Sequence, residues 1–190
     1  MGHKTAPNNP PTGPGGRRLG SLFHAVIQRL PLRNDDRTDT EKMAENLARL
    51  EGKNHGATSA EVAEVSRLCL GICDNVEYRS LLDEAETVRQ EVPFVLPLSD
   101  LPELDLPEEG FVEGSIDLLV RSRERTHILD YKTDRLDGAD PERAAERYWP
   151  QLIVYGLAAK ACGHTAGPVD LLIFFVRPQV FCRRRLTSDL

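Results

Sequence analysis

Long hydrophobic runs and nucleotide-binding loops are missing from this sequence. No stretch approaches the roughly 20 apolar residues that a membrane-spanning helix needs, and the N-terminus lacks the apolar core of a secretion signal. We therefore expect a cytoplasmic protein that makes no contact with a membrane. The Gly-x-x-x-x-Gly-Lys-Ser/Thr pattern is also missing, so the chain has no nucleotide-driven motor of its own.

An excess of positive charge is the second missing feature. The formal net charge is −6, from 24 Lys and Arg against 30 Asp and Glu. This balance argues against a protein that holds nucleic acid by bulk electrostatic attraction. Three short basic segments could still contact phosphates, and we interpret each as solvated surface: Arg17-Arg18, residues 121–125 and residues 183–185.

Cysteine is scarce as well. Cys69 and Cys73 are four residues apart on the apolar face of a predicted helix, which favours core thiols. Cys162 and Cys182 are isolated from each other. Structural disulfides are not expected for a protein inside a cell.

What remains is the composition of an ordinary globular domain. Of the 190 residues, 40% are hydrophobic and 28% are charged, which suits a single domain with a proper core. The first 16 residues are dense in Pro, Gly and Asn, which is typical of a linker or a disordered segment. We predict a linker over residues 1–18 and one domain over residues 19–190.

The apolar patterns alternate between helix and strand. They predict helices before and after a short mixed central sheet, hence an α/β (α+β) domain with a helical N-terminal part. Ser21 is a candidate cap for the first helix, and Asp140-Pro141 is a helix-start signature. We expect helices over residues 20–30, 40–50, 59–72, 76–89 and 141–162, the last one broken or kinked at Pro150, and strands from residue 91 and over 111–121, 126–131 and 169–176.

Two of these strands form a predicted hairpin around the polar segment 122–125. If Arg121 pairs with Thr126, Asp117 falls directly opposite Asp130. Side chains alternate between faces with period two, so Lys132 shares the face of Asp130. The apolar residues of the hairpin then take the other face and suit a core: Ile116, Leu118, Val120, Leu129 and Tyr131.

Two carboxylates directly opposite each other repel and destabilise a hairpin. A hard divalent cation such as Mg²⁺ or Mn²⁺ between them removes the repulsion, and Lys132 beside it can position water or stabilise developing charge on a phosphate. This is the chemistry of phosphodiester cleavage. The competing interpretation is a solvated surface on which Lys132 pairs with Asp117 and Asp130 as a salt bridge.

Further polar residues fit the same site. Gln151 and Tyr155 are four residues apart and project from one helix face. A glutamine there can bridge a metal-bound water and a phosphate, and a tyrosine hydroxyl can contact a DNA backbone or orient the lysine. His24 follows Gly20 by four residues, although a lone histidine is more often a satisfied, partly buried residue.

Gly114-Ser-Ile-Asp117-Leu followed by Ile128-Leu-Asp130-Tyr-Lys132-Thr-Asp134 resembles the PD-(D/E)xK nuclease superfamily. More narrowly, it is similar to the RecB-like nuclease domain at the C-terminus of the AddA and RecB helicase–nuclease subunits. The resemblance implies a restriction-endonuclease-like core. It also implies metal ligation by Asp117, Asp130 and His24, a catalytic role for Lys132, and the family's Gln/Tyr motif at Gln151 and Tyr155. Glu91 and Glu113 are secondary candidates near the site.

Some relatives carry an iron–sulfur cluster bound by one cysteine before the nuclease core and three clustered after it. Here two cysteines precede the core and the other two are separate, so no cluster is predicted.

The resemblance implies a Mg²⁺-dependent DNA exonuclease that processes ends in double-strand break repair by recombination. Its partner would be a helicase subunit or the helicase part of a longer chain. Two alternatives remain: a catalytically silent nuclease fold that serves as a DNA-binding scaffold, and a nuclease of the CRISPR adaptation or phage recombination type. The repulsive carboxylate pair counts against the first. The cysteine spacing counts against a nuclease of the CRISPR adaptation type, and His24 counts against one of the phage recombination type.

Overall fold

The computed structural model describes residues 16–33, 36–101 and 109–187. Residues 1–15 of the predicted linker therefore lie outside the described residues, and residues 16–18 belong to the first helix. The elements are α1 (Gly16–Ile27), α2 (Arg37–Asn54), α3 (Ser59–Asp74), α4 (Val76–Asp83), β1 (Thr87–Pro97), a 3₁₀ turn (Leu98–Asp100), β2 (Phe111–Arg121), β3 (Thr126–Lys132), α5 (Pro141–Ala145), α6 (Trp149–Ala161), β4 (Val169–Phe175) and β5 (Val180–Arg185).

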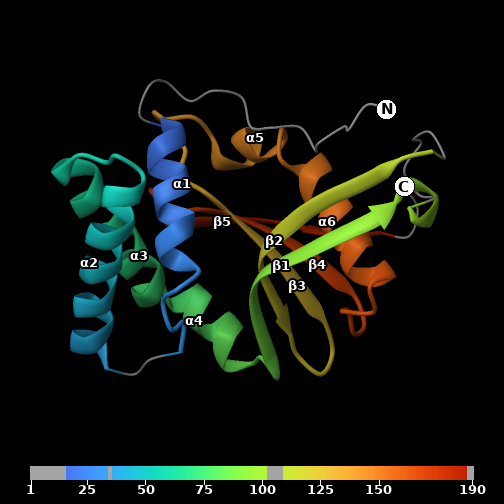
Figure 1. Cartoon of the computed structure of the whole chain (residues 1–190). Helices are drawn as coiled ribbons and strands as arrows, with labels where there is room; N and C mark the ends of the chain where they lie inside the picture. Colours follow the sequence, from blue (N-terminus) through green and yellow to red (C-terminus); the bar gives the residue numbers. More distant parts are fainter. Residues whose placement is uncertain (1–15, 34–35, 102–108, 188–190) are drawn as a thin grey trace.

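The five strands form one mixed sheet in the order β1-β2-β3-β4-β5. Among these strands only β3 and β4 run parallel, and α5 and α6 make the connection between them. Helices cover both faces, with α1 to α4 on one side and α5 and α6 on the other (Figure 1). We call the two hydrophobic layers the α1-side core and the α6-side core. The predicted α/β class, with a mixed sheet flanked by helices, is confirmed.

Polar side chains cap the N-termini of most of the helices. The Asp36 side chain accepts a hydrogen bond from the backbone of Asp39 at the start of α2, and Thr58 forms a capping box with Glu61 at the start of α3. Asp140 caps α5 as its signature predicted. The prediction for Ser21 is wrong, because α1 begins five residues earlier at Gly16.

The structure also corrects two segment predictions and adds one strand. The fourth helix ends at Asp83, and residues 87–89 are strand because they pair with the end of β2. The predicted helix 141–162 is broken as expected, but the break lies before Pro150: α5 ends at Ala145 and α6 begins at Trp149. Pro150 then lies in the first turn of α6, where a missing N–H costs nothing. The edge strand β5 was not predicted, and each of its three arginines forms an ion pair with a carboxylate.

Midway along β1 and β2, the alternation of side chains between the two faces of the sheet shifts by one residue in both strands. Gln90 reaches α1, where its side chain donates to the carbonyl of Ile27, whereas Val92 lies in the α6-side core. On the partner strand, Leu118 belongs to the α1-side core and Ile116 to the α6-side core. The prediction that Ile116 shares a face with Leu118 is therefore wrong. The change occurs at Glu91 and Asp117, between the pairs Gln90–Leu118 and Val92–Ile116.

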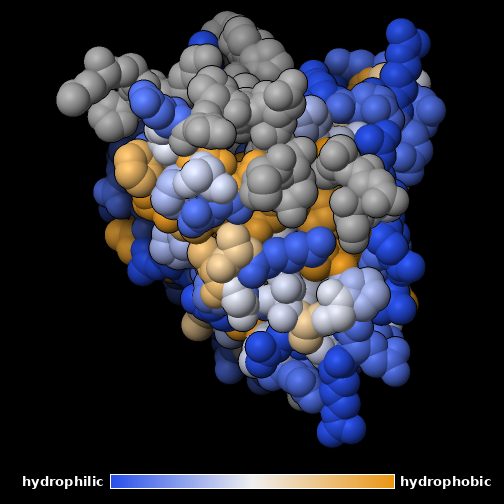
Figure 2. Space-filling view, turned by 90° about the vertical axis from the view of Figure 1, so that its right-hand side faces the viewer, coloured by the Kyte–Doolittle hydropathy of each residue, from blue (hydrophilic) through white to orange (hydrophobic). Residues whose placement is uncertain are grey.

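Beyond this point β1 and β2 continue as a two-stranded ribbon, since β3 pairs with β2 only from Leu118 onward. Val95 and Phe111 on the ribbon are exposed. Figure 2 views the molecule from the side of the ribbon and α6, where hydrophobic surface appears among hydrophilic residues. No helix in the described part of the chain is long and apolar enough to cross a membrane.

Candidate active site

The predicted hairpin register is found in the structure. Arg121 pairs with Thr126, and the ladder continues to Leu118 and Leu129. The next two positions are Asp117 and Asp130, and there the ladder stops. The Asp117 carboxylate instead accepts a hydrogen bond from the backbone N–H of Tyr131, with Oδ2 and N 2.8 Å apart. The two carboxylates thus lie where the strands separate.

Asp130 and Lys132 are buried on the side of the sheet that α6 covers. They are only 3% and 4% exposed, so they are not solvated surface residues. Lys132 Nζ is 2.5 Å from Asp130 Oδ2, an ion-pair contact. That oxygen nevertheless accepts no well-oriented hydrogen bond from the described residues. The Lys132 ammonium is therefore the cation that neutralises this buried carboxylate, and the oxygen retains capacity to accept a further ligand.

Helix α6 brings Gln151 and Tyr155 to the lysine. Lys132 Nζ donates to Gln151 Oε1 at 3.1 Å, and Gln151 Nε2 donates to the Tyr155 hydroxyl at 2.6 Å. The i, i+4 spacing places both side chains on the face of α6 that meets the sheet. Burial is the main cause that raises the pKa of the Tyr155 hydroxyl, and nearby Asp130 adds to it. Tyr155 therefore stays protonated and available as a donor.

His24 approaches from the opposite side of the sheet. Its Nδ1 is 3.5 Å from Asp117 Oδ1. His24, Glu91 and Asp117 each offer a ligand atom, and these atoms lie within 4.8 Å of one another. The Ser115 hydroxyl donates to Glu91 Oε2 at 2.9 Å and so holds the glutamate in place. Carboxylate oxygens with one imidazole nitrogen form a donor set that suits a divalent cation.

Glu91 was only a secondary candidate in the sequence. The β1–β2 register places it directly opposite Asp117, in a gap between the strand pairs on either side. Its φ of 47° is uncommon for a residue with a side chain, and such strained conformations cluster at functional sites. Asp130 lies on the lysine side of the site rather than in the three-residue group, and the group does not include Glu113.

The raised pKa of Asp117 also favours a metal site at this position. Burial raises its pKa from an ordinary 3.8 to about 7, and the neighbouring Asp130 adds to the rise. His24, the Tyr131 backbone and Lys132 partly counteract it. A carboxylate that is costly to ionise becomes an effective ligand once a cation neutralises it. The residues present therefore fit a divalent metal ion.

Two glycines allow the elements to approach closely. A Cβ on Gly114 would lie 2.8 Å from the Phe94 ring and 3.3 Å from the Tyr155 ring. A Cβ on Gly20 would lie 3.2 Å from the Thr133 hydroxyl, just after Lys132. The first glycine lets α6 contact β2 beside Asp117, and the second lets α1 carry His24 to the sheet.

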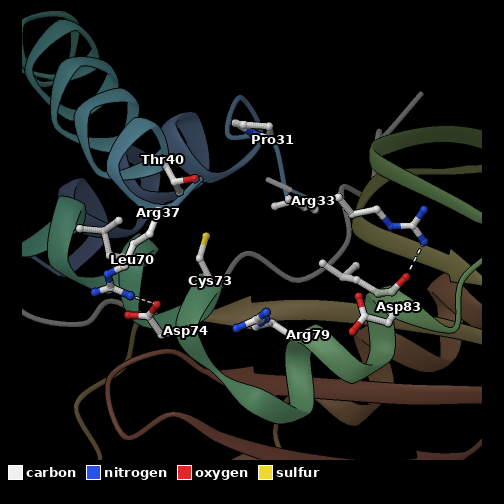
Figure 3. A pocket seen from close by; sticks show the side chains of 11 residues that line it. Pro31, Arg33, Arg37, Thr40, Leu70, Cys73, Asp74, Arg79 and Asp83 are labelled. Carbon is white, nitrogen blue, oxygen red and sulfur yellow. Dashed lines mark hydrogen bonds and ion pairs between the residues drawn. The ribbon is translucent and has the colours of Figure 1, made fainter. Parts of the chain in front are cut away.

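A separate cavity of about 420 Å³ lies between the α1–α2 connection and helices α3 and α4. It does not coincide with the acidic site, and none of the predicted site residues lines it. Figure 3 shows that Arg37 pairs with Asp74 and that Arg33 turns to a carbonyl of α4. These contacts tie the helices together, so we assign this cavity a structural role.

A family model for the PD-(D/E)XK nuclease superfamily matches residues 3–187. The chain belongs to this superfamily. Its relatives include an ATP-dependent helicase/nuclease subunit from Listeria monocytogenes serotype 4b (strain F2365), with 26% identity over 167 residues. The subunit of the same name in Desulfitobacterium hafniense (strain DSM 10664 / DCB-2) is 33% identical over 153 residues.

The alignments cover 83% and 74% of this chain but only 13% and 11% of those two relatives. The chain thus spans roughly an eighth of the length of the relatives that it matches. Among solved structures, one described as the crystal structure of SSO0001 aligns over 92% of this chain and 77% of its own, with a TM-score of 0.38 and 16% identity.

Proposed function

We propose that this nuclease-family chain is a Mg²⁺-dependent deoxyribonuclease that hydrolyses phosphodiester bonds. One observation carries the proposal: the buried Asp130–Lys132 pair lies beside the group formed by His24, Glu91 and Asp117. A cation site and a fixed ammonium side by side are what hydrolysis of a phosphodiester needs.

His24, Asp117 and Asp130 would hold the metal, with Glu91 as a further ligand, and Mn²⁺ would substitute for Mg²⁺. A bound divalent ion supplies Lewis acidity and lowers the pKa of a bound water. The Lys132 ammonium stabilises the negative charge that develops on the phosphate as water adds and the P–O bond to the leaving oxygen breaks. Gln151 fixes this ammonium, and Tyr155 fixes Gln151 in turn.

The biological role that we propose is the processing of DNA ends in double-strand break repair by recombination, as an exonuclease. The relatives named as helicase/nuclease subunits support this role, because in them a nuclease occurs in a protein that is also named a helicase. A helicase subunit, or the helicase part of a longer chain, would then be the partner that delivers DNA. A silent DNA-binding scaffold is the alternative that experiment has to exclude.

Cleavage of end-labelled single- and double-stranded DNA tests the proposal. We expect products with Mg²⁺ or Mn²⁺ and none with EDTA, and the product ladder gives the polarity. No cleavage, together with no heat on titrating either metal into the protein, would contradict the enzyme and favour the scaffold. Metal binding without cleavage would support the site and indicate that the helicase partner is required.

Glu91→Gln is expected to weaken binding of Mn²⁺ by about tenfold or more, because it removes one negative ligand from a site built of few groups. Isothermal titration of the metal measures the effect. Glu113→Gln is the matched control, since Glu113 is exposed on β2 and lies outside the ligand group. Equal affinities for the two variants would remove Glu91 from the ligand set.

A further inference from the structure

Within the described part of the chain, three groups contact the Lys132 ammonium, and two of them belong to the site described above. It donates to Gln151 Oε1 and contacts Asp130 Oδ2. The third neighbour is the ring of Tyr148, whose centroid lies 4.3 Å from Nζ. An ammonium this close to an aromatic face is attracted by the ring's negative quadrupole. The lysine side chain is 5% exposed, so little solvent competes with this contact.

The Tyr148 ring is itself held from several sides. It is 3% exposed and packs against Phe175 with the ring centroids 6.3 Å apart. Its hydroxyl donates to Asp134 Oδ2 at 2.8 Å. The other oxygen of Asp134 accepts from Arg147 at 2.7 Å. The Arg147 guanidinium also lies over the ring, with its central carbon 4.7 Å from the ring centroid. These contacts hold the ring in place beside the lysine.

The arrangement also keeps a third carboxylate away from the lysine. Asp134 follows Lys132 by two residues in sequence, yet its side chain is engaged by Arg147 and by the Tyr148 hydroxyl. A free carboxylate there would draw the ammonium away from Asp130 and Gln151. An aromatic face instead attracts the charge and accepts no proton from it.

We infer that Tyr148 is a positioning residue that holds the Lys132 ammonium against Asp130 and Gln151, and that Asp134 and Arg147 fix the ring for this purpose. The ring–ammonium contact stands on geometry alone. Its consequence for cleavage rests on the proposed function.

Kinetic measurements on two variants distinguish the role of the Tyr148 ring from the role of its hydroxyl. Tyr148→Leu removes the aromatic face, and we expect kcat for DNA cleavage to fall about 10- to 100-fold with KM within about twofold, because displacement of a reacting group by about 1 Å has effects of this size. Tyr148→Phe keeps the face and loses only the bond to Asp134, so its kcat should fall by less than about fivefold. A larger loss for Tyr148→Phe than for Tyr148→Leu would overturn the inference.

A double-mutant cycle tests the contact without any activity. Tyr148→Leu and Lys132→Met are combined, and unfolding by urea is measured for the four proteins without metal. We expect a coupling of about fivefold or more in the unfolding equilibrium constant. Tyr148→Met, closer in length to tyrosine, replaces the leucine variant if that variant does not fold.

Phe181→Leu is the matched control for the cycle. Phe181 contacts Phe174 in the α1-side core, on the other face of the sheet from Lys132, and its coupling to Lys132→Met should be negligible. If Tyr148→Leu shows no more coupling than this control, the ring does not hold the ammonium and the inference fails. If the parent protein neither cleaves DNA nor binds Mg²⁺ or Mn²⁺, the proposed function fails, and the cycle still decides the inference.

Discussion

Lys132→Met is expected to lower kcat for DNA cleavage by about 10²- to 10⁴-fold, the range for loss of a group that stabilises transition-state charge or transfers a proton. Methionine preserves most of the length of the side chain but removes the charge and the donor to Gln151 Oε1. The ammonium is buried, and Asp130, Gln151 and the Tyr148 ring all fix its place. Neither water nor a mobile side chain can therefore substitute for it. Cleavage of labelled DNA under single-turnover conditions measures the loss.

The same substitution has a second effect, on stability. It leaves Asp130 buried without its cation, and breaking a buried ion pair in this way costs about 3–5 kcal/mol. A divalent metal offsets the unpaired charge, so Mn²⁺ should raise the unfolding temperature of the variant more than that of the parent. Denaturation scans with and without metal measure the difference.

Lys160→Met is the control, since Lys160 is exposed at the end of α6. It should leave both cleavage and metal response unchanged. Cleavage by Lys132→Met within about threefold of the parent would mean that another group stabilises the transition state, and the assignment of Lys132 would be wrong.

The hairpin that carries these groups could be predicted from the sequence because local rules determine it. A four-residue polar loop and two apolar strands leave one sensible register, and that register places Asp117 next to Asp130. Gln151 and Tyr155 follow from helical spacing alone. Gln151 and Tyr155 lie next to Lys132 in the structure, and His24, which the family resemblance indicated, lies next to Asp117.

Glu91 and Tyr148 could not be assigned in the same way, because their roles depend on contacts between distant elements. Glu91 reaches Asp117 only through the β1–β2 register and a backbone conformation with positive φ. Strict alternation along β2 also predicted the wrong face of the sheet for Ile116, because the alternation shifts by one residue at Asp117. Tyr148 precedes α6 by one residue, and nothing in its neighbours along the chain shows that its ring meets Lys132.

The conflict between stability and function is greatest at Asp117, where we expect Asp117→Asn to abolish detectable metal binding and cleavage yet stabilise the metal-free protein. Burial and the adjacent Asp130 make ionisation of this carboxyl unfavourable. Asparagine keeps the oxygen that accepts the Tyr131 N–H and carries no charge. The gain at pH 8 should exceed about 1 kcal/mol, which for a domain of this size is about 2–4 °C in Tm.

The sign of the pH dependence follows from the direction of the shift. The pKa of Asp117 rises on folding from 3.8 to about 7, so the folded parent binds a proton that the unfolded chain releases. Stability from this group is fully present below pH 4 and is lost as the pH rises through 7. The advantage of Asp117→Asn over the parent should therefore be near zero at pH 4 and largest above pH 7.

Thermal denaturation at pH 4, 6 and 8, with EDTA or with Mn²⁺, tests both effects. Metal should raise the Tm of the parent at pH 8 and leave that of Asp117→Asn unchanged, because only the parent then offers the Asp117 carboxylate to the cation. Glu113→Gln, on the same strand but exposed, should behave as the parent does. If Asp117→Asn were less stable than the parent in EDTA at pH 8, the carboxylate would be stabilising the fold in its charged form. Asp117 would then serve the structure first, and metal binding would not be the reason for its burial.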